Sequence, residues 1–163
     1  MNFNDVVVVK MKTKRLNLHL NEAEIHIERL KDVLNRLKKI YPLTLERFKN
    51  LTPEEKDMLD TLAFRFSKLQ DLIGSKIFRE YLQEVGFIVE DKAFLELLKE
   101  IEKEGIVDID SWSEFRKVRN ILAHDYSDDL EEKAEAINYL IEKPPNLIGV
   151  IEKIESEINK QGN

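Results

Sequence analysis

Residues 111–126 contain the side chains of this chain that are best suited to chemistry. The segment reads Ser-Trp-Ser-Glu-Phe-Arg-Lys-Val-Arg-Asn-Ile-Leu-Ala-His-Asp-Tyr. A histidine titrates near neutral pH and can transfer protons, and the planar guanidinium of an arginine binds pairs of phosphate or carboxylate oxygens. His124 and Arg119 therefore indicate proton transfer beside a bound anion.

A helix over this segment would divide its polar side chains between two positions. Because successive residues of a helix are about 100° apart, Arg116, Asn120 and His124 form one polar stripe in which Asn120 can reach the imidazole. Arg119 falls within the apolar arc instead, where it would pair with a buried carboxylate or extend past its neighbours. Each polar residue alone has a structural explanation, and only their concentration favours a functional site. The apolar arc consists of Trp112, Phe115, Val118 and Leu122.

The end of this segment resembles a family signature. Arg119 is followed at once by Asn120, His124 lies five residues after Arg119, and Tyr126 lies two residues after His124. This spacing is similar to the R-x4-H-x-Y signature of the HEPN superfamily, particularly its HepT-like toxins and the related substrate-binding partners of minimal nucleotidyltransferases. No counterpart in the family is evident for residues 1–20 or for the long helix expected from residue 52 to residue 85.

The resemblance implies a metal-independent endoribonuclease that is the toxin of a toxin-antitoxin pair and acts on RNA as a two-fold symmetric homodimer. In this interpretation Arg119 and His124 are catalytic, Arg116 and Asn120 bind phosphate, and neither a metal nor another cofactor is needed. The chemistry is compatible, because RNA cleavage needs a proton-transfer group and a cation that stabilises the phosphorane. Since one chain supplies one such histidine, a second proton-transfer group would come from the symmetry-related partner.

Tyr126 is the expected control point of this site. A cognate minimal nucleotidyltransferase, acting as the antitoxin, would attach a nucleotide to its phenol and so place a bulky anion in the groove that receives RNA. The alternative for Tyr126 is a purely structural ring that donates one hydrogen bond. The alternative for the whole chain is a non-catalytic partner subunit of such a nucleotidyltransferase, whose polar stripe binds a nucleotide or phosphate without cleaving RNA.

The two remaining histidines show no pattern of a metal site. His19 and His26 lie in the first fifty residues, and the carboxylates near them form no metal-site pattern. We therefore expect both to be ordinary surface or packing residues.

The elements that must position the signature are predicted to be helices. Apolar residues recur three and four apart through most of the chain, which predicts an all-α bundle of five or six helices of HEPN type, forming one domain over residues 1–163. Residues 1–20 are ambiguous, because Val6 to Val9 favour a strand, and we expect an extended arm or a helix lead-in. The first predicted helices cover residues 21–41 and 53–85, the second with a bend near Gly74, and a short turn of helix is expected in 43–50. A third helix is capped by Glu90 or Asp91 and ended by Gly105, and a fourth is capped by Asp110 and Ser111. A fifth is capped by Asp128 or Asp129, and a sixth follows Pro144 and Pro145.

Composition and charge restrict the class of protein. Hydrophobic residues make up 42% of the chain and charged residues 36%, with 5 Gly and 4 Pro, which is typical of packed helices. The net charge of −6 argues against a general nucleic-acid coat protein. Residues 1–50 nevertheless have a net charge of +5, which indicates either ordinary solvated helix faces or a basic end that meets RNA or an acidic partner.

The cellular location follows from what the sequence lacks. There is no cysteine, which suits a reducing compartment. No apolar run approaches the roughly 18 residues of a membrane span. We therefore expect a cytoplasmic protein that does not enter a membrane.

Overall fold

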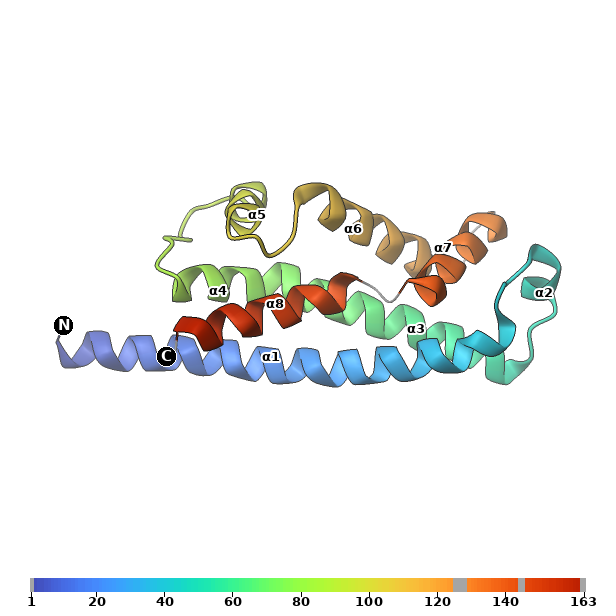
Figure 1. Cartoon of the computed structure of the whole chain (residues 1–163), viewed down its shortest axis with the longest axis horizontal. Coiled ribbons are helices and arrows are strands. Elements are labelled where there is room, and N and C mark those ends of the chain that lie inside the picture. The colour runs from blue at the N-terminus through green and yellow to red at the C-terminus, as the bar shows by residue number, and fades with distance from the viewer. Residues whose placement is uncertain (1, 125–128, 144–145, 162–163) are drawn as a thin grey trace.

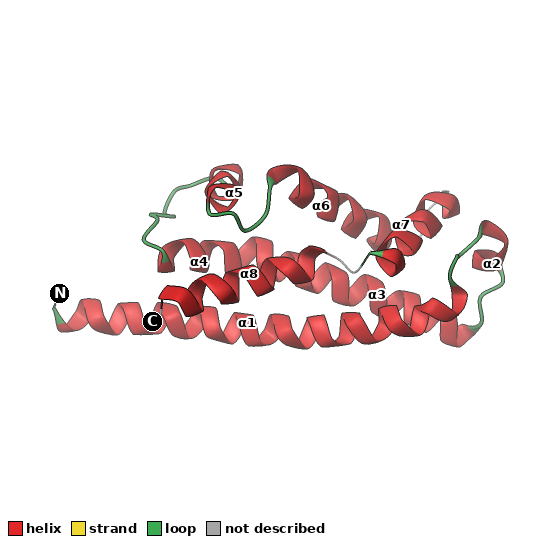
Figure 2. Ribbon diagram, in the orientation of Figure 1, coloured by secondary structure: helices red, strands yellow, loops and turns green. Residues whose placement is uncertain are grey.

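The computed structural model describes residues 2–124, 129–143 and 146–161, without the side chains of residues 5–13. Every regular element within these ranges is helical and none is a strand (Figure 2). The all-α prediction is confirmed. The elements are α1 (Phe3–Leu37), η1 (Lys38–Ile40), α2 (Leu45–Lys49), α3 (Pro53–Leu72), η2 (Ile73–Ile77), α4 (Phe78–Glu84), α5 (Phe94–Lys103), α6 (Ile109–Ala123), α7 (Leu130–Glu142) and α8 (Asn146–Gln161).

Two long helices and a shorter one form one side of the molecule. Helix α1 runs beside the continuous helix made of α3, η2 and α4, and α8 lies along them (Figure 1). Helices α5, α6 and α7 form the opposite side, where α5 is seen nearly end-on and α6 runs along α3 (Figure 1). Helix α6 contacts α3, α5 and α7. The core between the layers is closed by fully buried side chains such as Phe66, Trp112 and Ile151. Helix α6, which contains the signature, therefore rests directly on α3.

The start of α3 is fixed by a capping box, as the sequence predicted. The Thr52 hydroxyl accepts a hydrogen bond from the Glu55 amide at 3.1 Å, and the Glu55 carboxylate accepts one from the Thr52 amide at 3.0 Å. Pro53 occupies the first turn, where its missing N–H leaves no hydrogen bond unmade. This cap sets the register of the helix that contains the residues facing α6.

The helix that begins at Pro53 contains one irregular turn. Helices α3 and α4 are joined by η2, a single π-helical segment that includes Gly74. The predicted helix over 53–85 is thus confirmed, and the irregularity lies where a bend was expected. A Cβ atom on Gly74 would lie 2.9 Å from Cζ2 of Trp112. Glycine at this position therefore lets the indole of α6 pack directly against the turn.

Residues 1–20 correct one sequence-based expectation. Helix α1 begins at Phe3, so Val6 to Val9 belong to a helix. The helix lead-in is therefore confirmed, and the strand and the extended arm are wrong. The β preference of valine is a weak, context-dependent effect, and continuation of the helix satisfies every backbone group of the segment locally. Leu16 and Leu20 are buried in the core, which ties this part of α1 to the bundle.

Two helix starts also differ from prediction. The N-cap of α6 is Asp108 and not Asp110, and its carboxylate accepts hydrogen bonds from both the amide and the hydroxyl of Ser111 at 3.0 and 2.6 Å. Asp110 lies instead in the first turn of α6, where a carboxylate is favourable. Helix α5 has Ala93 as its N-cap without a side-chain hydrogen bond, whereas Asp91 has a positive φ of 62° in the preceding turn. Asp129 caps α7 as predicted.

The contact between α8 and α1 includes two carboxyl groups. Burial, together with a hydrogen bond to Glu24 and the nearby charge of Glu152, raises the pKa of Glu155 to about 7. The folded protein therefore holds a proton here that the unfolded chain, with its ordinary pKa near 4.5, releases. The stability that this proton provides is complete below about pH 4.5 and is lost as the pH rises to about 7.

Replacing Glu155 with glutamine should accordingly raise the thermal midpoint of unfolding by a few degrees at pH 8 and have little effect at pH 5. The neutral amide removes the repulsion that develops when both carboxyl groups ionise. Thermal unfolding followed by circular dichroism at the two pH values measures this, with Glu28→Gln on the exposed face of α1 as the matched control. The same shift at both pH values would contradict the interpretation.

Candidate functional site

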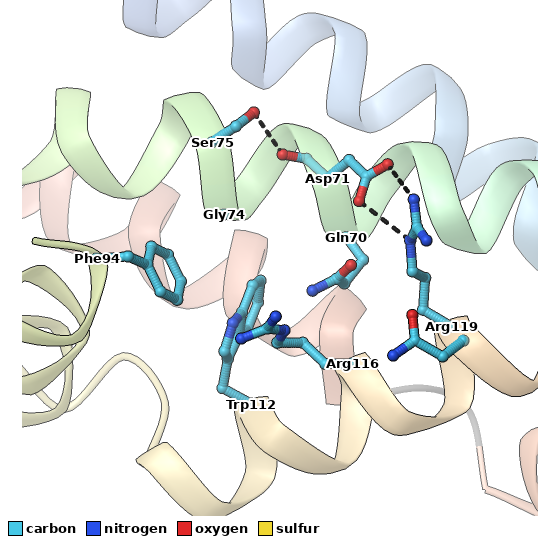
Figure 3. A pocket seen from close by; sticks show the side chains of 9 residues that line it. Gln70, Asp71, Gly74, Ser75, Phe94, Trp112, Arg116 and Arg119 are labelled. Atoms are coloured by element: carbon cyan, nitrogen blue, oxygen red, sulfur yellow. Dashed lines mark hydrogen bonds and ion pairs between the residues drawn. The ribbon is translucent and has the colours of Figure 1, made fainter.

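Arg119 forms an ion pair with Asp71 at the surface between α6 and α3. Its Nε donates to one carboxylate oxygen at 3.2 Å and its Nη2 to the other at 2.9 Å (Figure 3). The side chains are 33% and 50% exposed. The expected carboxylate partner is present but is not buried, and the guanidinium extends past its apolar neighbours to reach it, as the second alternative expected. Because exposed pairs contribute about 0–1 kcal/mol, this pair orients Arg119 more than it stabilises the fold.

A pocket of about 480 Å³ lies next to this pair. Helices α3 and η2 form one wall, α6 forms the other, and the first residue of α5 stands at one end (Figure 3). The pocket combines aromatic rings, amides and guanidinium groups, which is a lining suited to an aromatic anion. Its lining residues are Gln70, Asp71, Gly74, Ser75, Phe94, Trp112, Arg116, Arg119 and Asn120.

Three of the predicted site residues meet at this pocket. Arg116 and Asn120 lie four residues apart on one face of α6, and Arg119 lies beside them. Arg116 and Asn120 are exposed, and neither has an ion pair or hydrogen bond from its side chain within the described part of the chain. Arg116 is therefore a cation available to an incoming anion.

His124 lies at the edge of this arrangement. It is the C-cap of α6, with an exposed side chain, and it is not among the residues that line the pocket. Its carbonyl oxygen accepts a hydrogen bond from Nζ of Lys133 at 3.2 Å. The expected hydrogen bond from Asn120 to the imidazole is absent from the described residues. Tyr126 lies outside the residues that the structure describes.

Sequence reasoning missed the residues that α3 and α5 contribute. Gln70 is only 6% exposed, and its amide has no hydrogen-bond partner within residues 2–124, 129–143 and 146–161. The indole Nε1 of Trp112 is also buried without a partner there. A glutamine among apolar neighbours and Gly74 within a helix were the available signals, but neither identifies α6 as the facing element.

The other two histidines pack between helices. His19 of α1 meets both carboxylate oxygens of Glu80, the longer contact being 2.8 Å. His26 is buried and accepts a hydrogen bond from Nη1 of Arg65 at 3.1 Å. Burial and the guanidinium lower the pKa of His26. Among the described residues, no group of three or more His, Cys, Asp or Glu side chains could hold a metal ion.

Comparison with known proteins found no matching family model, no matching curated protein and no matching solved structure. Within the described ranges no helix has both the length and the apolar character that crossing a membrane requires. The case for a function therefore depends on the residues and geometry of this pocket.

Proposed function

We propose that this chain is a HEPN-type endoribonuclease, the toxin of a toxin-antitoxin system, which cleaves RNA without a metal. One observation supports this most strongly. Arg119, Arg116 and Asn120 converge on one open pocket, and the helix that contains them ends at His124. A phosphate held by the guanidinium groups would then be bound by the same helix that ends at His124, whose imidazole can transfer protons.

The proposed reaction is a transesterification at phosphorus. The RNA 2′-oxygen loses its proton to a histidine and forms a bond to phosphorus while the bond to the 5′-oxygen breaks. The leaving 5′-oxygen gains a proton, so the products are a 2′,3′-cyclic phosphate and a 5′-hydroxyl. Arg119 would stabilise the extra charge on the phosphorane. To do so its guanidinium must exchange the carboxylate of Asp71 for phosphate oxygens.

The purified chain should therefore cleave single-stranded RNA in the presence of EDTA and leave 2′-O-methyl RNA of the same sequence intact. The modified RNA keeps every phosphate but lacks the nucleophile. Gel electrophoresis of end-labelled RNA, with mass analysis of the 3′ ends, measures both the rate and the expected cyclic phosphate. Cleavage of the two substrates at equal rates would overturn the transesterification mechanism.

We further propose a two-fold symmetric homodimer in which the α6 helices of the two chains lie near the axis. A single His124 cannot easily accept one proton and donate another within one step, and a second copy would supply the missing group. Sedimentation equilibrium at micromolar concentration should give twice the chain mass of 19.2 kDa. A monomeric mass with full ribonuclease activity would overturn the dimer.

A cognate minimal nucleotidyltransferase is the proposed antitoxin, and Tyr126 is its proposed target. This tyrosine lies two positions after His124 in sequence, so a nucleotide attached there would oppose RNA by size and by charge. The alternative function is a partner subunit that binds a nucleotide without cleaving RNA. The absence of His124 from the pocket lining favours this alternative, and nucleotide binding without any cleavage in EDTA would establish it.

A further inference from the structure

We infer that the pocket between α3 and α6 binds one unpaired nucleobase, so that the chain selects a particular base next to the bound phosphate. The identity of the ligand as RNA rests on the proposed function. The lining itself supplies the two features that a base requires, an apolar surface and a hydrogen-bonding edge.

The apolar surface is formed mainly by the Phe94 ring, and the indole of Trp112, which is only 1% exposed, lies beside it. The ring centroids of Phe94 and Trp112 lie 6.4 Å apart, and the Phe94 ring is 36% exposed at the pocket. Gly74 places no side chain between them. The indole of Trp112 also packs against the ring of Phe78, with ring centroids 4.8 Å apart. The aromatic wall is therefore fixed before any ligand arrives.

The hydrogen-bonding edge is the amide of Gln70. This side chain is 94% buried and lines the pocket, and neither its oxygen nor its nitrogen has a partner among the described residues. Figure 3 shows the amide directed into the space between Trp112 and Arg119. Its amide atoms are not among the described buried side-chain atoms that lack a partner, so they are open to the pocket. An amide offers an adjacent donor and acceptor that match the edge of a base.

The position of the cations gives the orientation of the nucleotide. Arg116 is exposed at the pocket and has no ionic partner within the described chain, so its guanidinium can receive the phosphate while the base enters toward Gln70. A base that is stacked and paired in a duplex cannot enter a pocket between two helices. The site therefore fits single-stranded RNA.

The test uses the single tryptophan of the chain as a reporter of this pocket. Calorimetric titration with the four nucleoside 5′-monophosphates and with ribose 5-phosphate measures affinity, and Trp112 fluorescence reports where the ligand binds. At least one nucleotide should bind at least tenfold more tightly than ribose 5-phosphate and change the fluorescence. Gln70→Leu should weaken that nucleotide about tenfold, which corresponds to about 1.4 kcal/mol, and should leave ribose 5-phosphate unaffected.

Gln83→Leu, on α4 and away from the pocket lining, is the matched control and should bind as the unmodified chain does. Circular dichroism of both variants checks that they fold. Equal affinity for nucleotides and ribose 5-phosphate, or nucleotide binding unchanged by Gln70→Leu, would overturn the base pocket. Because these measurements contain no cleavage step, a base pocket without ribonuclease activity would refute only the proposed function. Cleavage without any base preference would refute only the pocket.

Discussion

Replacing His124 with alanine is expected to lower the rate of RNA cleavage in EDTA by about 10²- to 10⁴-fold, which is the usual contribution of a positioned acid-base group. The fold should be unaffected, because the imidazole is exposed at the end of α6 and makes no hydrogen bond or ion pair within the described chain. Single-turnover cleavage rates, together with thermal unfolding followed by circular dichroism, separate a loss of chemistry from a loss of structure.

Two matched variants make this result specific. Lys117→Ala removes an exposed cation from the same helix at a position that does not line the pocket, so it controls for a general loss of charge. His19→Ala removes a histidine that is committed to Glu80. Both should cleave RNA at nearly the unmodified rate. If His124→Ala also cleaved at that rate, His124 would have no part in catalysis and the ribonuclease assignment of this site would be wrong.

Replacing Trp112 with alanine is expected to reduce the free energy of unfolding by about 3–5 kcal/mol, the range found for large aromatic residues in protein cores. The indole is 1% exposed, and it packs against Phe78 and Phe115, with ring centroids 4.8 and 6.1 Å away. Its loss would leave a cavity between α6 and the turn at Gly74. Urea unfolding at equilibrium measures the change.

One control variant retains an aromatic ring at position 112, and the other removes a ring outside the core. Trp112→Phe should cost less than the alanine variant, because it retains a ring between the helices. Phe64→Ala removes a ring of similar size that is 51% exposed on α3, and it should change the free energy of unfolding by less than 1 kcal/mol. A loss of less than 1 kcal/mol for Trp112→Ala would contradict the view that this residue holds α6 on α3.

Most helices could be predicted because their apolar spacing and capping residues agree. The capping box at Thr52 and the cap at Asp129 are local signals, and both were found where the sequence indicated them. The environment of Arg119 could not be predicted in the same way. Its partner Asp71 lies 48 residues earlier, and only the packing of α6 on α3 brings the two together. The same packing turns Gln70 from one residue of a helix into part of a pocket wall.

The spacing of buried residues in the sequence contains a signal for the π-helical segment η2 that ordinary α-helical periodicity does not explain. Four fully buried residues of this helix follow one another at three steps of four: Leu69, Ile73, Ile77 and Tyr81. In a regular α-helix, twelve residues make three turns plus about 120°, so the first and last would face different directions. One extra residue in η2 removes about 100° of this difference. Repeated steps of four therefore indicated an inserted residue.

The pairing of Arg119 with Asp71 has a consequence for how RNA binding would respond to salt. Binding to single strands weakens with salt by a slope of about −0.7 for each phosphate that is neutralised, because each contact releases counterions. If Arg119 exchanged Asp71 for a phosphate, the freed carboxylate would take up a cation as the phosphate released one. This leaves Arg116 as the cation of the pocket without an ionic partner among the described residues. The affinity of this acidic chain for RNA would then vary little between dilute and physiological salt and would come mainly from the aromatic wall.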